Sequence, residues 1–383
     1  MAKIGEVCTI VSGSTPKTSV TSYWDGNIKW ITPAELNEDT FYIMDSVRHI
    51  TEEGKEKTGL SYLPTGTVIL SSRAPIGKTA IAGCEMCCNQ GFKNLICSDA
   101  IYNEYLYFFL KSKTDYLNSL GRGATFKEIS KSIVESIEIP LPEVNQQKEI
   151  AEKFKKLEQL ISLRKQQLAK LDELVKARFV EMFGEPSSNP MGWLQTTVGA
   201  ECYYIKDGPH KSLTDVGMEN GYPFISVRNI VNGYIDFSTA KYISEADYKD
   251  AIKKCCPEKG DILYSKGGTT GIAKLVDIDI KFANWVHLAV LKFNHNEFNG
   301  SFFEKMLNCD YCYKQSQMLT KGIANRDLVL SAMAQIKIYK PPILLQNQFA
   351  SFVERIDQQK RTVQQSLEKL ELMKKVLVQE YFG

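Results

Sequence analysis

The chain contains one long internal repeat, and this repeat limits the folds that it can adopt. The segment from Gln146 to Gly184 aligns without a gap on the segment from Leu345 to Gly383, an offset of 199 residues. Upstream, Gly66–Gly77 aligns on Gly260–Gly271 with an offset of 194 residues. A repeat of this length predicts two copies of one globular unit, each followed by the same kind of helix.

Each repeat ends in a segment that is typical of a long helix. Apolar residues recur there at alternating steps of three and four for about five heptads, which predicts a coiled coil about 60 Å long. The Phe-Gly that closes each segment suits a helix C-cap. The alternative is an amphipathic helix that packs only on its own domain. The residues expected at the coiled-coil interface are Phe154, Leu157, Ile161, Leu168, Leu171, Val175, Val353, Ile356, Val363, Leu367, Leu370 and Leu377.

Four charged residues interrupt the two apolar stripes: Arg164, Arg178, Lys360 and Lys374. They do not align with one another in the repeat, because Arg164 matches Val363 and Lys360 matches Ile161. A parallel register would therefore set charged side chains against apolar ones. The connection between the helices is a whole domain, so either orientation is possible by length. An antiparallel pair would relate the two globular units by pseudo-twofold symmetry.

The predicted fold class is α+β, with two mixed α/β domains joined by the two long helices. Each domain should close with one aromatic-rich helix (Glu104–Leu120 and Gly300–Leu319), a glycine-containing loop, a short helix and a final strand. The expected boundaries are residues 1–142 for the first domain, 143–185 for the central spacer helix, 186–342 for the second domain and 343–383 for the C-terminal spacer helix.

The stretch Ser72–Thr79 ends in Gly-Lys-Thr, as a phosphate-binding loop does. The first glycine of that motif is replaced by Ser72, and in the second copy Gly77-Lys78-Thr79 becomes Gly271-Ile272-Ala273. A turn needs only its glycine, whereas a phosphate loop needs its lysine. We therefore interpret the stretch as a strand–turn–strand element, with an NTPase that uses Lys78 as the alternative.

Composition excludes several classes of protein. No apolar run reaches the ~18–20 residues of a membrane span, and the N-terminus lacks a signal-peptide core, so we expect a cytoplasmic protein with no membrane partner. The ten cysteines are interpreted as reduced, buried thiols. A zinc site at the pairs Cys84/Cys87 and Cys309/Cys312 is the alternative. The net charge of +2 argues against a basic surface overall, but not against local basic loops.

Basic and hydrogen-bonding residues recur at the same predicted loops in both copies. Such side chains bind DNA phosphates or base edges, although any one of them taken alone is equally explained as a solvated surface charge. Aromatic residues beside the strands, such as Trp24, Trp30 and Trp285, are expected in the core. The candidate DNA-binding residues are Thr15, Lys17, Arg73, Lys78, Arg122, Lys127, His210, Lys211, Arg228, Lys266, Lys274, Lys321 and Arg326.

No catalytic motif accompanies these loops. The sequence has neither a G-x-S-x-G elbow nor an H-E-x-x-H pair, and its four histidines are scattered. A glycine-rich methyltransferase cofactor loop is also missing. Two similar modules without visible chemistry indicate a protein that recognises a partner and does not itself catalyse a reaction.

This layout resembles the specificity subunit of type I restriction–modification enzymes. The resemblance covers essentially the whole chain. It rests on IGEVCTIVSGSTPKT at the start, on LPTGTVILSSRAPIGKTAI with its copy PEKGDILYSKGGTTGIAKL, and above all on IPLPEVNQQKEIAEKFKKLEQLI with its C-terminal repeat. It implies two target recognition domains that each read one half of a bipartite, asymmetric DNA site, and two helices that form an antiparallel spacer.

The resemblance also implies partners. The chain would bind double-stranded DNA and two modification subunits, which hold S-adenosylmethionine and methylate adenine, while restriction subunits using ATP and Mg²⁺ would join them for phage defence. No cofactor or metal is expected in this chain. The first loops differ, since Gly208-Pro209-His210-Lys211 stands where the first copy has Gly13-Ser14-Thr15-Pro16-Lys17. A coiled-coil scaffold without DNA recognition is the alternative function.

Overall fold

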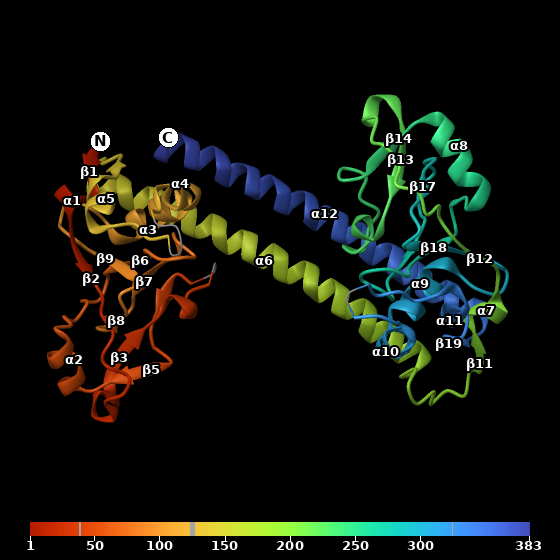
Figure 1. The fold of residues 1–383 in the computed structure, drawn as a ribbon, viewed down its shortest axis with the longest axis horizontal. Coiled ribbons are helices and arrows are strands. Elements are labelled where there is room, and N and C mark those ends of the chain that lie inside the picture. Colours follow the sequence, from red (N-terminus) through yellow and green to blue (C-terminus); the bar gives the residue numbers. More distant parts are fainter. Residues whose placement is uncertain (38–39, 123–126, 324) are drawn as a thin grey trace. The chain divides into compact units, whose positions relative to one another are not determined.

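The computed structural model describes residues 1–37, 40–122, 127–323 and 325–383 (Figure 1). The chain divides into two compact units. Unit 1 comprises Met1–Gln166 together with Gln364–Gly383, and unit 2 comprises Gln167–Val363. Two helices of 40 residues, α6 (Val144–Phe183) and α12 (Ile343–Phe382), each contribute residues to both units.

Unit 1 is built around a five-stranded sheet in the order β2-β9-β6-β7-β4, with a three-stranded sheet β5-β3-β8 and a short pair β1-β10. Its strands are β1 (Ala2–Lys3), β2 (Cys8–Ser12), β3 (Trp24–Ile31), β4 (Tyr42–Ile43), β5 (Arg48–Ile50), β6 (Val68–Ser71), β7 (Thr79–Ala82), β8 (Cys87–Cys88), β9 (Phe92–Cys97) and β10 (Glu138–Ile139). Its shorter helices are α1 (Ile4–Val7), α2 (Glu52–Thr58), α3 (Asn103–Ser112), α4 (Thr114–Leu120) and α5 (Lys131–Ser136).

Unit 2 has the corresponding sheets β12-β18-β15-β16, β14-β13-β17 and β11-β19. Its strands are β11 (Leu194–Thr197), β12 (Cys202–Asp207), β13 (Tyr222–Ile225), β14 (Lys241–Ile243), β15 (Ile262–Ser265), β16 (Ala273–Leu275), β17 (Ala283–Asn284), β18 (Leu288–Phe293) and β19 (Lys337–Lys340). Its shorter helices are α7 (Val198–Glu201), α8 (Glu245–Lys254), α9 (Gly300–Asn308), α10 (Asp310–Leu319) and α11 (Leu330–Met333).

The two units therefore share one topology, as the repeat predicts. In each unit the central strand pairs antiparallel with a strand that follows a short turn: β6 with β7, and β15 with β16. The glycines that end these turns, Gly77 and Gly271, have φ of +95° and +90°, a region that side chains with a Cβ rarely adopt. The strand–turn–strand interpretation of this stretch is confirmed.

The helices α6 and α12 run antiparallel where they pair inside each unit. In unit 1, Lys374 of α12 forms an ion pair of 2.7 Å with Glu158 of α6, and Arg164 donates a hydrogen bond of 3.2 Å to Ser366. In unit 2, Lys360 of α12 lies 2.6 Å from Asp172 of α6. Three of the four charged stripe residues therefore meet polar partners across the helix pair, whereas Arg178 forms its ion pair with Glu181 of its own helix, at 2.8 Å.

The apolar stripe residues are withdrawn from solvent. Eight of the residues proposed for the coiled-coil interface are buried: Phe154, Leu157, Ile161, Val175, Val353, Ile356, Val363 and Leu367. The other four are partly buried: Leu168, Leu171, Leu370 and Leu377. The helices also pack on their units, because the core cluster of unit 1 includes Phe154 and that of unit 2 includes Phe349.

The phenylalanine before each closing glycine anchors the helix end in a core. Phe382 stacks on Phe154 of unit 1 with ring centroids 5.3 Å apart, and Phe183, at the equivalent position of α6, lies 4.7 Å from Phe302 of unit 2. Gly184 and Gly383 adopt φ of +76° and +73°, so the predicted C-caps are confirmed. Thus each unit receives the start of one long helix and the end of the other.

The prediction of single helices over Glu104–Leu120 and Gly300–Leu319 is wrong. The first is divided at Lys113, between α3 and α4, and the second at Cys309, between α9 and α10. At the second break, the Asn308 side chain both accepts from and donates to the backbone of Ala273 in β16, at 2.9 and 2.8 Å. Because Asn308 completes the edge strand, α9 ends there and α10 begins in a new direction.

Candidate nucleic-acid interface

In unit 1, several loops meet at one end of the five-stranded sheet. The pairings Ser12↔Lys93 and Ser71↔Phe92 place the loops after β2 and β6 beside the loop before β9. The backbone N–H of Ser72 donates to Gly91 (2.7 Å) and that of Ile129 donates to Ser72 (2.9 Å), so the segment after α4 joins them. We call residues 13–17, 72–78, 89–91, 122 and 127–129 loop surface 1.

The equivalent loops of unit 2 meet in the same way. Strand pairings Asp207↔Ala289 and Ser265↔Leu288 bring together the loops after β12, after β15 and before β18. The backbone N–H of Lys266 donates to His287 (2.9 Å), and that of Leu328 donates to Lys266 (2.7 Å). We call residues 208–211, 266–272, 285–287, 321–323 and 325–328 loop surface 2.

Each loop surface contains a closing loop whose two ends are joined by a pair of backbone hydrogen bonds. In unit 1, Arg122 and Glu128 exchange N–H···O=C bonds of 3.1 and 3.0 Å. In unit 2, Lys321 and Asp327 exchange bonds of 2.9 Å each. These pairs are 199 residues apart in sequence, so the closing loop has the same base in both units.

The carboxylate of each closing loop meets a buried lysine, which we call the clamp lysine. In unit 1 this is Lys93 on β9, whose Nζ lies 3.1 Å from Glu128, while the exposed Arg73 lies 2.9 Å from the same carboxylate. Burial acts to raise the pKa of Glu128, but the hydrogen bonds and charges of Arg73 and Lys93 outweigh it and lower the pKa. The acid is therefore ionised and holds both cations.

In unit 2 the clamp lysine is Lys266, which leaves the end of β15. Its Nζ lies 3.0 Å from Asp327 of the closing loop and 3.4 Å from Asp207 at the end of β12. Lys254 adds an ion pair of 2.7 Å to Asp207. Burial acts to raise the pKa of Asp207, but Lys254 and Lys266 outweigh it and lower the pKa. One buried cation thus connects two loops of loop surface 2.

The first loop of each surface begins with a glycine that nothing larger can replace. A Cβ on Gly13 would lie 2.0 Å from the carbonyl oxygen of Asn89, and one on Gly208 would lie 1.8 Å from that of Asn284. Both contacts are with backbone, so relief would require moving β8 or β17. The close approach fixes the point at which the residues that differ between the two copies begin.

A duplicated unit of this kind matches a known protein family. The family model described as the type I restriction modification DNA specificity domain matches residues 1–173 and again residues 205–372. The chain belongs to this family.

Named specificity subunits match this chain over most or part of its length. The MjaIX specificity subunit of Methanocaldococcus jannaschii is 32% identical over 373 residues, which is 92% of this chain and 85% of that protein. The EcoR124I/EcoR124II specificity subunit of Escherichia coli is 26% identical over 164 residues, 41% of this chain and 40% of that one. The crystal structure of the S subunit from M. genitalium covers all of this chain and 95% of its own at 17% identity with a TM-score of 0.60, which supports the fold.

Most of the predicted DNA-binding residues lie on the two loop surfaces of this specificity subunit. On loop surface 1, Lys17, Arg73, Arg122 and Lys127 are exposed, whereas Thr15 and Lys78 are partly buried. In unit 2, the exposed residues are His210, Lys211, Arg228, Lys321 and Arg326. Arg228 lies outside loop surface 2, where its guanidinium donates to the carbonyl of Thr239 (2.9 Å).

Three of the predicted lysines are engaged inside the protein. Lys266 is the clamp lysine, and Lys274 is buried in an ion pair of 3.2 Å with Glu304. The Nζ of Lys78 donates to the carbonyls of Pro33 (3.2 Å) and Leu36 (2.7 Å). Lys78 therefore fastens its turn to a neighbouring loop, which does not favour the NTPase alternative.

The tryptophans of unit 1 hold the backbone of the first loop by hydrogen bonds from the core. The indole N–H of Trp30 donates to the carbonyl of Ser14 (3.0 Å), and that of Trp24 donates to Lys17 (3.2 Å). Both rings are buried and pack edge to face at 5.2 Å. The expected core role of Trp24 and Trp30 is confirmed, and it includes holding the loop backbone.

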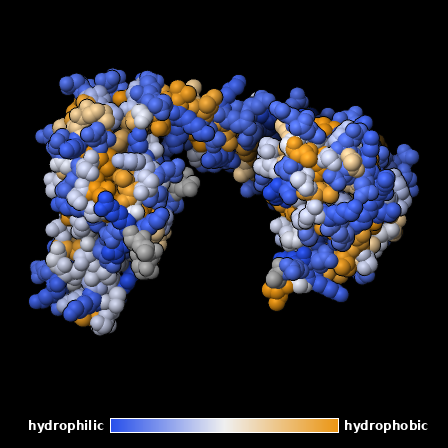
Figure 2. All heavy atoms as spheres, turned by 45° about the horizontal axis from the view of Figure 1, so that its top comes forward, coloured by the Kyte–Doolittle hydropathy of each residue, from blue (hydrophilic) through white to orange (hydrophobic). Residues whose placement is uncertain are grey.

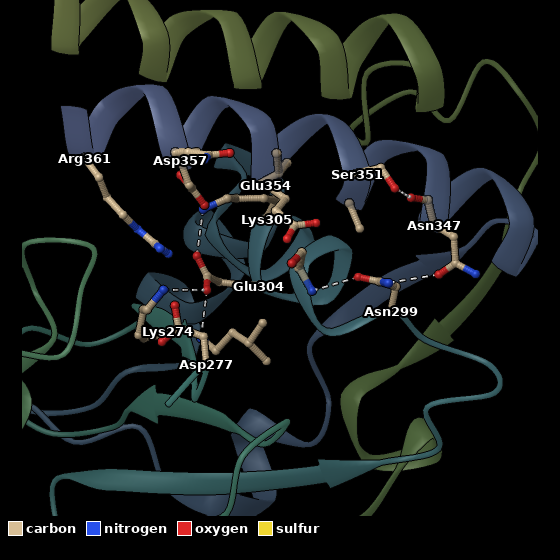
Figure 3. A pocket seen from close by; sticks show the side chains of 15 residues that line it. Lys274, Asp277, Asn299, Glu304, Lys305, Asn347, Ser351, Glu354, Asp357 and Arg361 are labelled. Carbon is tan, nitrogen blue, oxygen red and sulfur yellow. Dashed lines mark hydrogen bonds and ion pairs between the residues drawn. The ribbon is translucent and has the colours of Figure 1, made fainter. Parts of the chain in front are cut away.

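A groove of about 720 Å³ lies in unit 2 between α9, α12 and the end of β16 (Figure 3). At its floor Glu304 meets Lys274 (3.2 Å) and Lys305 (2.7 Å) and accepts from the backbone N–H of Leu275 (2.8 Å). Burial acts to raise the pKa of Glu304, but these partners outweigh it and lower the pKa. Because its buried charges are paired, the groove is a polar surface feature and not a built ligand pocket.

Sequence reasoning missed a buried glutamine in each unit. Gln147 lies at the start of α6, accepts from the backbone N–H of Tyr102 (2.8 Å), and donates to the carbonyls of Ala100 and Pro142. Gln346 in α12 makes the same three kinds of bond, to Asn299, Glu297 and Pro341. Both side chains are fully buried. Their matching positions in the repeat were a usable signal, since a polar residue in an apolar entry segment must be satisfied.

Among the residues that the structure describes, no group of His, Cys, Asp or Glu is arranged to hold a metal ion. The ten cysteines are free thiols. Over the same described ranges, no helix combines the length and apolar character of a membrane span. On the visible face of each unit, hydrophilic side chains are interspersed with intermediate and hydrophobic ones (Figure 2).

Proposed function

We propose that this specificity subunit reads a bipartite, asymmetric DNA site, with loop surface 1 on one half-site and loop surface 2 on the other. The observation that carries the proposal is the shared base of the two surfaces combined with different exposed residues. Arg122 and Lys127 stand in one closing loop where Lys321 and Arg326 stand in the other. The same backbone would present different hydrogen-bonding groups to each half-site.

The electrostatics of the loop surfaces support this role. The chain carries a net charge of only +2, yet exposed cations gather on both loop surfaces. Local positive charge favours binding to phosphates and makes affinity fall steeply with salt. A scaffold without DNA recognition would not require such loops to be held by buried ion pairs.

The test uses the full chain expressed with its modification partner. Sequencing that detects modified bases should find adenine methylation at one bipartite motif. Arg122→Ala should relax the first half of the motif, and Lys321→Ala the second half. Lys259→Ala is the matched control, because Lys259 is exposed in unit 2 but precedes β15 at the opposite end of the sheet. If Arg122→Ala and Lys321→Ala weaken the same half, the assignment of one unit to each half-site is wrong.

Membership of this family indicates assembly with other subunits of a restriction–modification complex. We propose that two modification subunits bind this chain and hold S-adenosylmethionine, that restriction subunits supply the ATP- and Mg²⁺-dependent activity, and that this chain itself is not catalytic. Exposed apolar residues on the helices of unit 1 are candidate contacts: Leu160, Leu163, Leu372, Met373 and Val376. Leu372→Lys should weaken co-purification with the modification partner, whereas Met191→Lys, an exposed loop position of unit 2, should not.

We also propose that helix length sets the number of base pairs between the half-sites. The 40-residue helices α6 and α12 are the segments that connect the units in sequence, and each is about 60 Å long. Inserting matched heptads into both helices should lengthen the spacer of the methylated motif and leave both half-sites unchanged. An unchanged spacer would contradict this part of the proposal.

A further inference from the structure

The closing loop of loop surface 2 presents an apolar side chain to solvent. Ile323 is 100% exposed, although isoleucine is among the residues most often buried. It follows Gly322, whose φ of +82° turns the chain at this point. A single exposed isoleucine needs no explanation by itself, so the inference depends on what surrounds it and on how the loop is held.

The base of this loop is fixed by five separate contacts. Lys321 and Asp327 are joined by two backbone hydrogen bonds, and the Asp327 carboxylate meets the clamp lysine Lys266 at 3.0 Å. The backbone N–H of Gly268 donates to Arg326 (3.1 Å), and the Arg326 guanidinium donates to the Gln317 side chain. Contacts that already order the base of the loop reduce the conformational entropy that binding would cost there.

The residues beside Ile323 are suited to DNA. Lys321 and Arg326 are exposed cations on either side of it, and Asn325, also exposed, carries an amide able to bond with base edges. Proteins that bind the minor groove combine such cations and amides with an apolar side chain inserted between base pairs, which unstacks a step and bends the duplex. A protein-binding surface would instead extend the apolar area, and here the flanking side chains are charged or polar.

We propose that Ile323 acts as a wedge that enters a base-pair step in or next to the half-site bound by unit 2. The inference rests on the proposed DNA-reading function and adds a mechanism to it. Pyrimidine–purine steps open most easily, so the wedge would favour such a step without any hydrogen bond to it. Unit 2 would then read part of its half-site through deformability.

The experiment uses the complex of this chain with its modification partner and a duplex that carries the methylated motif. 2-Aminopurine is placed in turn at each step around the second half-site, and its fluorescence is measured on binding. One position should brighten with the wild-type chain, lose that rise in Ile323→Ala and keep it in Ile323→Leu. Ile280→Ala, at a half-exposed isoleucine of unit 2 outside loop surface 2, should leave the rise unchanged.

The outcomes separate this inference from the proposed function. If methylation of the bipartite motif persists and no position brightens, or if Ile323→Ala retains the rise, the wedge is overturned while DNA reading stands. If Ile323→Ala instead prevents assembly with the modification partner, Ile323 is a protein contact and the wedge is likewise overturned. If the wild-type complex methylates no bipartite motif, the proposed function itself has failed.

Discussion

Replacing the clamp lysine of unit 2 by methionine tests whether a buried charge organises loop surface 2. Methionine fills nearly the same volume as the aliphatic part of lysine, so Lys266→Met removes the charge without opening a large cavity. The substitution leaves Asp207 and Asp327 without the cation that lies 3.4 and 3.0 Å from them. Any effect then reports on the ion pairs.

The expected loss of stability depends on which partners each carboxylate keeps after the substitution. Removing one partner of a fully buried ion pair costs about 3–5 kcal/mol. Here Asp207 keeps Lys254 at 2.7 Å, and the side chain of Asp327 is 45% exposed and is able to regain water. We therefore expect a smaller loss, about 1–3 kcal/mol, confined to unit 2. Lys259→Met, at an exposed position, should stay within about 0.5 kcal/mol of the wild type.

Hydrogen exchange read peptide by peptide during urea titration measures the two units separately. In Lys266→Met, peptides of loop surface 2 should exchange at lower urea, whereas peptides of unit 1 serve as an internal reference. Lys93→Met should show the reverse pattern, since its carboxylate partner is Glu128 of unit 1. If Lys266→Met behaves like Lys259→Met, or if it weakens both units equally, the clamp does not organise loop surface 2.

Four further substitutions test the anchoring of the helices. Phe382→Ala should destabilise unit 1 by about 3–5 kcal/mol and Phe183→Ala should do the same to unit 2, because each ring is buried in a core; differential scanning calorimetry of the full chain measures both. Gln346→Leu should cost about 2–4 kcal/mol in urea unfolding, since one buried and two part-buried hydrogen bonds to backbone groups are lost. The pKa of Glu158 is lowered because Lys111 and Lys374 outweigh the effect of burial. The ionised carboxylate therefore stabilises the fold at neutral pH, and this stabilisation is lost as the pH falls below the ordinary glutamate pKa of 4.5. Glu158→Gln should flatten this acid dependence in thermal unfolding measured from pH 7 to pH 3.

The duplicated fold could be predicted because repetition and periodicity are properties of sequence itself. An offset of 199 residues identifies equivalent positions such as Gly184 and Gly383, and the unmatched charge of Lys360 argues against a parallel register of the two helices. These arguments need no knowledge of distant contacts. They also explain why the strand–turn–strand interpretation around Gly77 is confirmed, since a glycine that recurs without its neighbours signals a backbone requirement.

The roles of individual loop residues could not be predicted in the same way. The sequence does not distinguish Lys266 and Lys274 from the exposed cations of the same loops, yet both lysines are buried against carboxylates. Their partners Asp327 and Glu304 lie far along the chain, and only the sheet brings them together. Whether a lysine faces DNA or a buried acid is decided by tertiary contacts, which residue type and local pattern do not encode.

The clamp lysines show how two surfaces keep one geometry while their sequences diverge. With the offset of 194 residues, Lys266 corresponds to Ser72, whose hydroxyl is buried without a hydrogen-bond partner among the described residues. Unit 1 instead supplies its cation from Lys93, on the neighbouring strand β9. What the two units share is therefore a buried positive charge opposite the closing-loop acid, and not a lysine at one aligned position.

This arrangement separates the residues that hold the loops from the residues that face solvent. Two features fix the ends of the loops on the protein side. These are the close approach of Gly13 and Gly208 to backbone atoms and the ion pairs of Glu128 and Asp327. Exposed positions between these ends contribute little to the stability of the unit, because surface substitutions away from such contacts cost little free energy of unfolding. Exchange of the exposed residues alone is then expected to change which half-site is bound without unfolding the unit. A reader that must acquire new target sequences by substitution needs this division between support and contact.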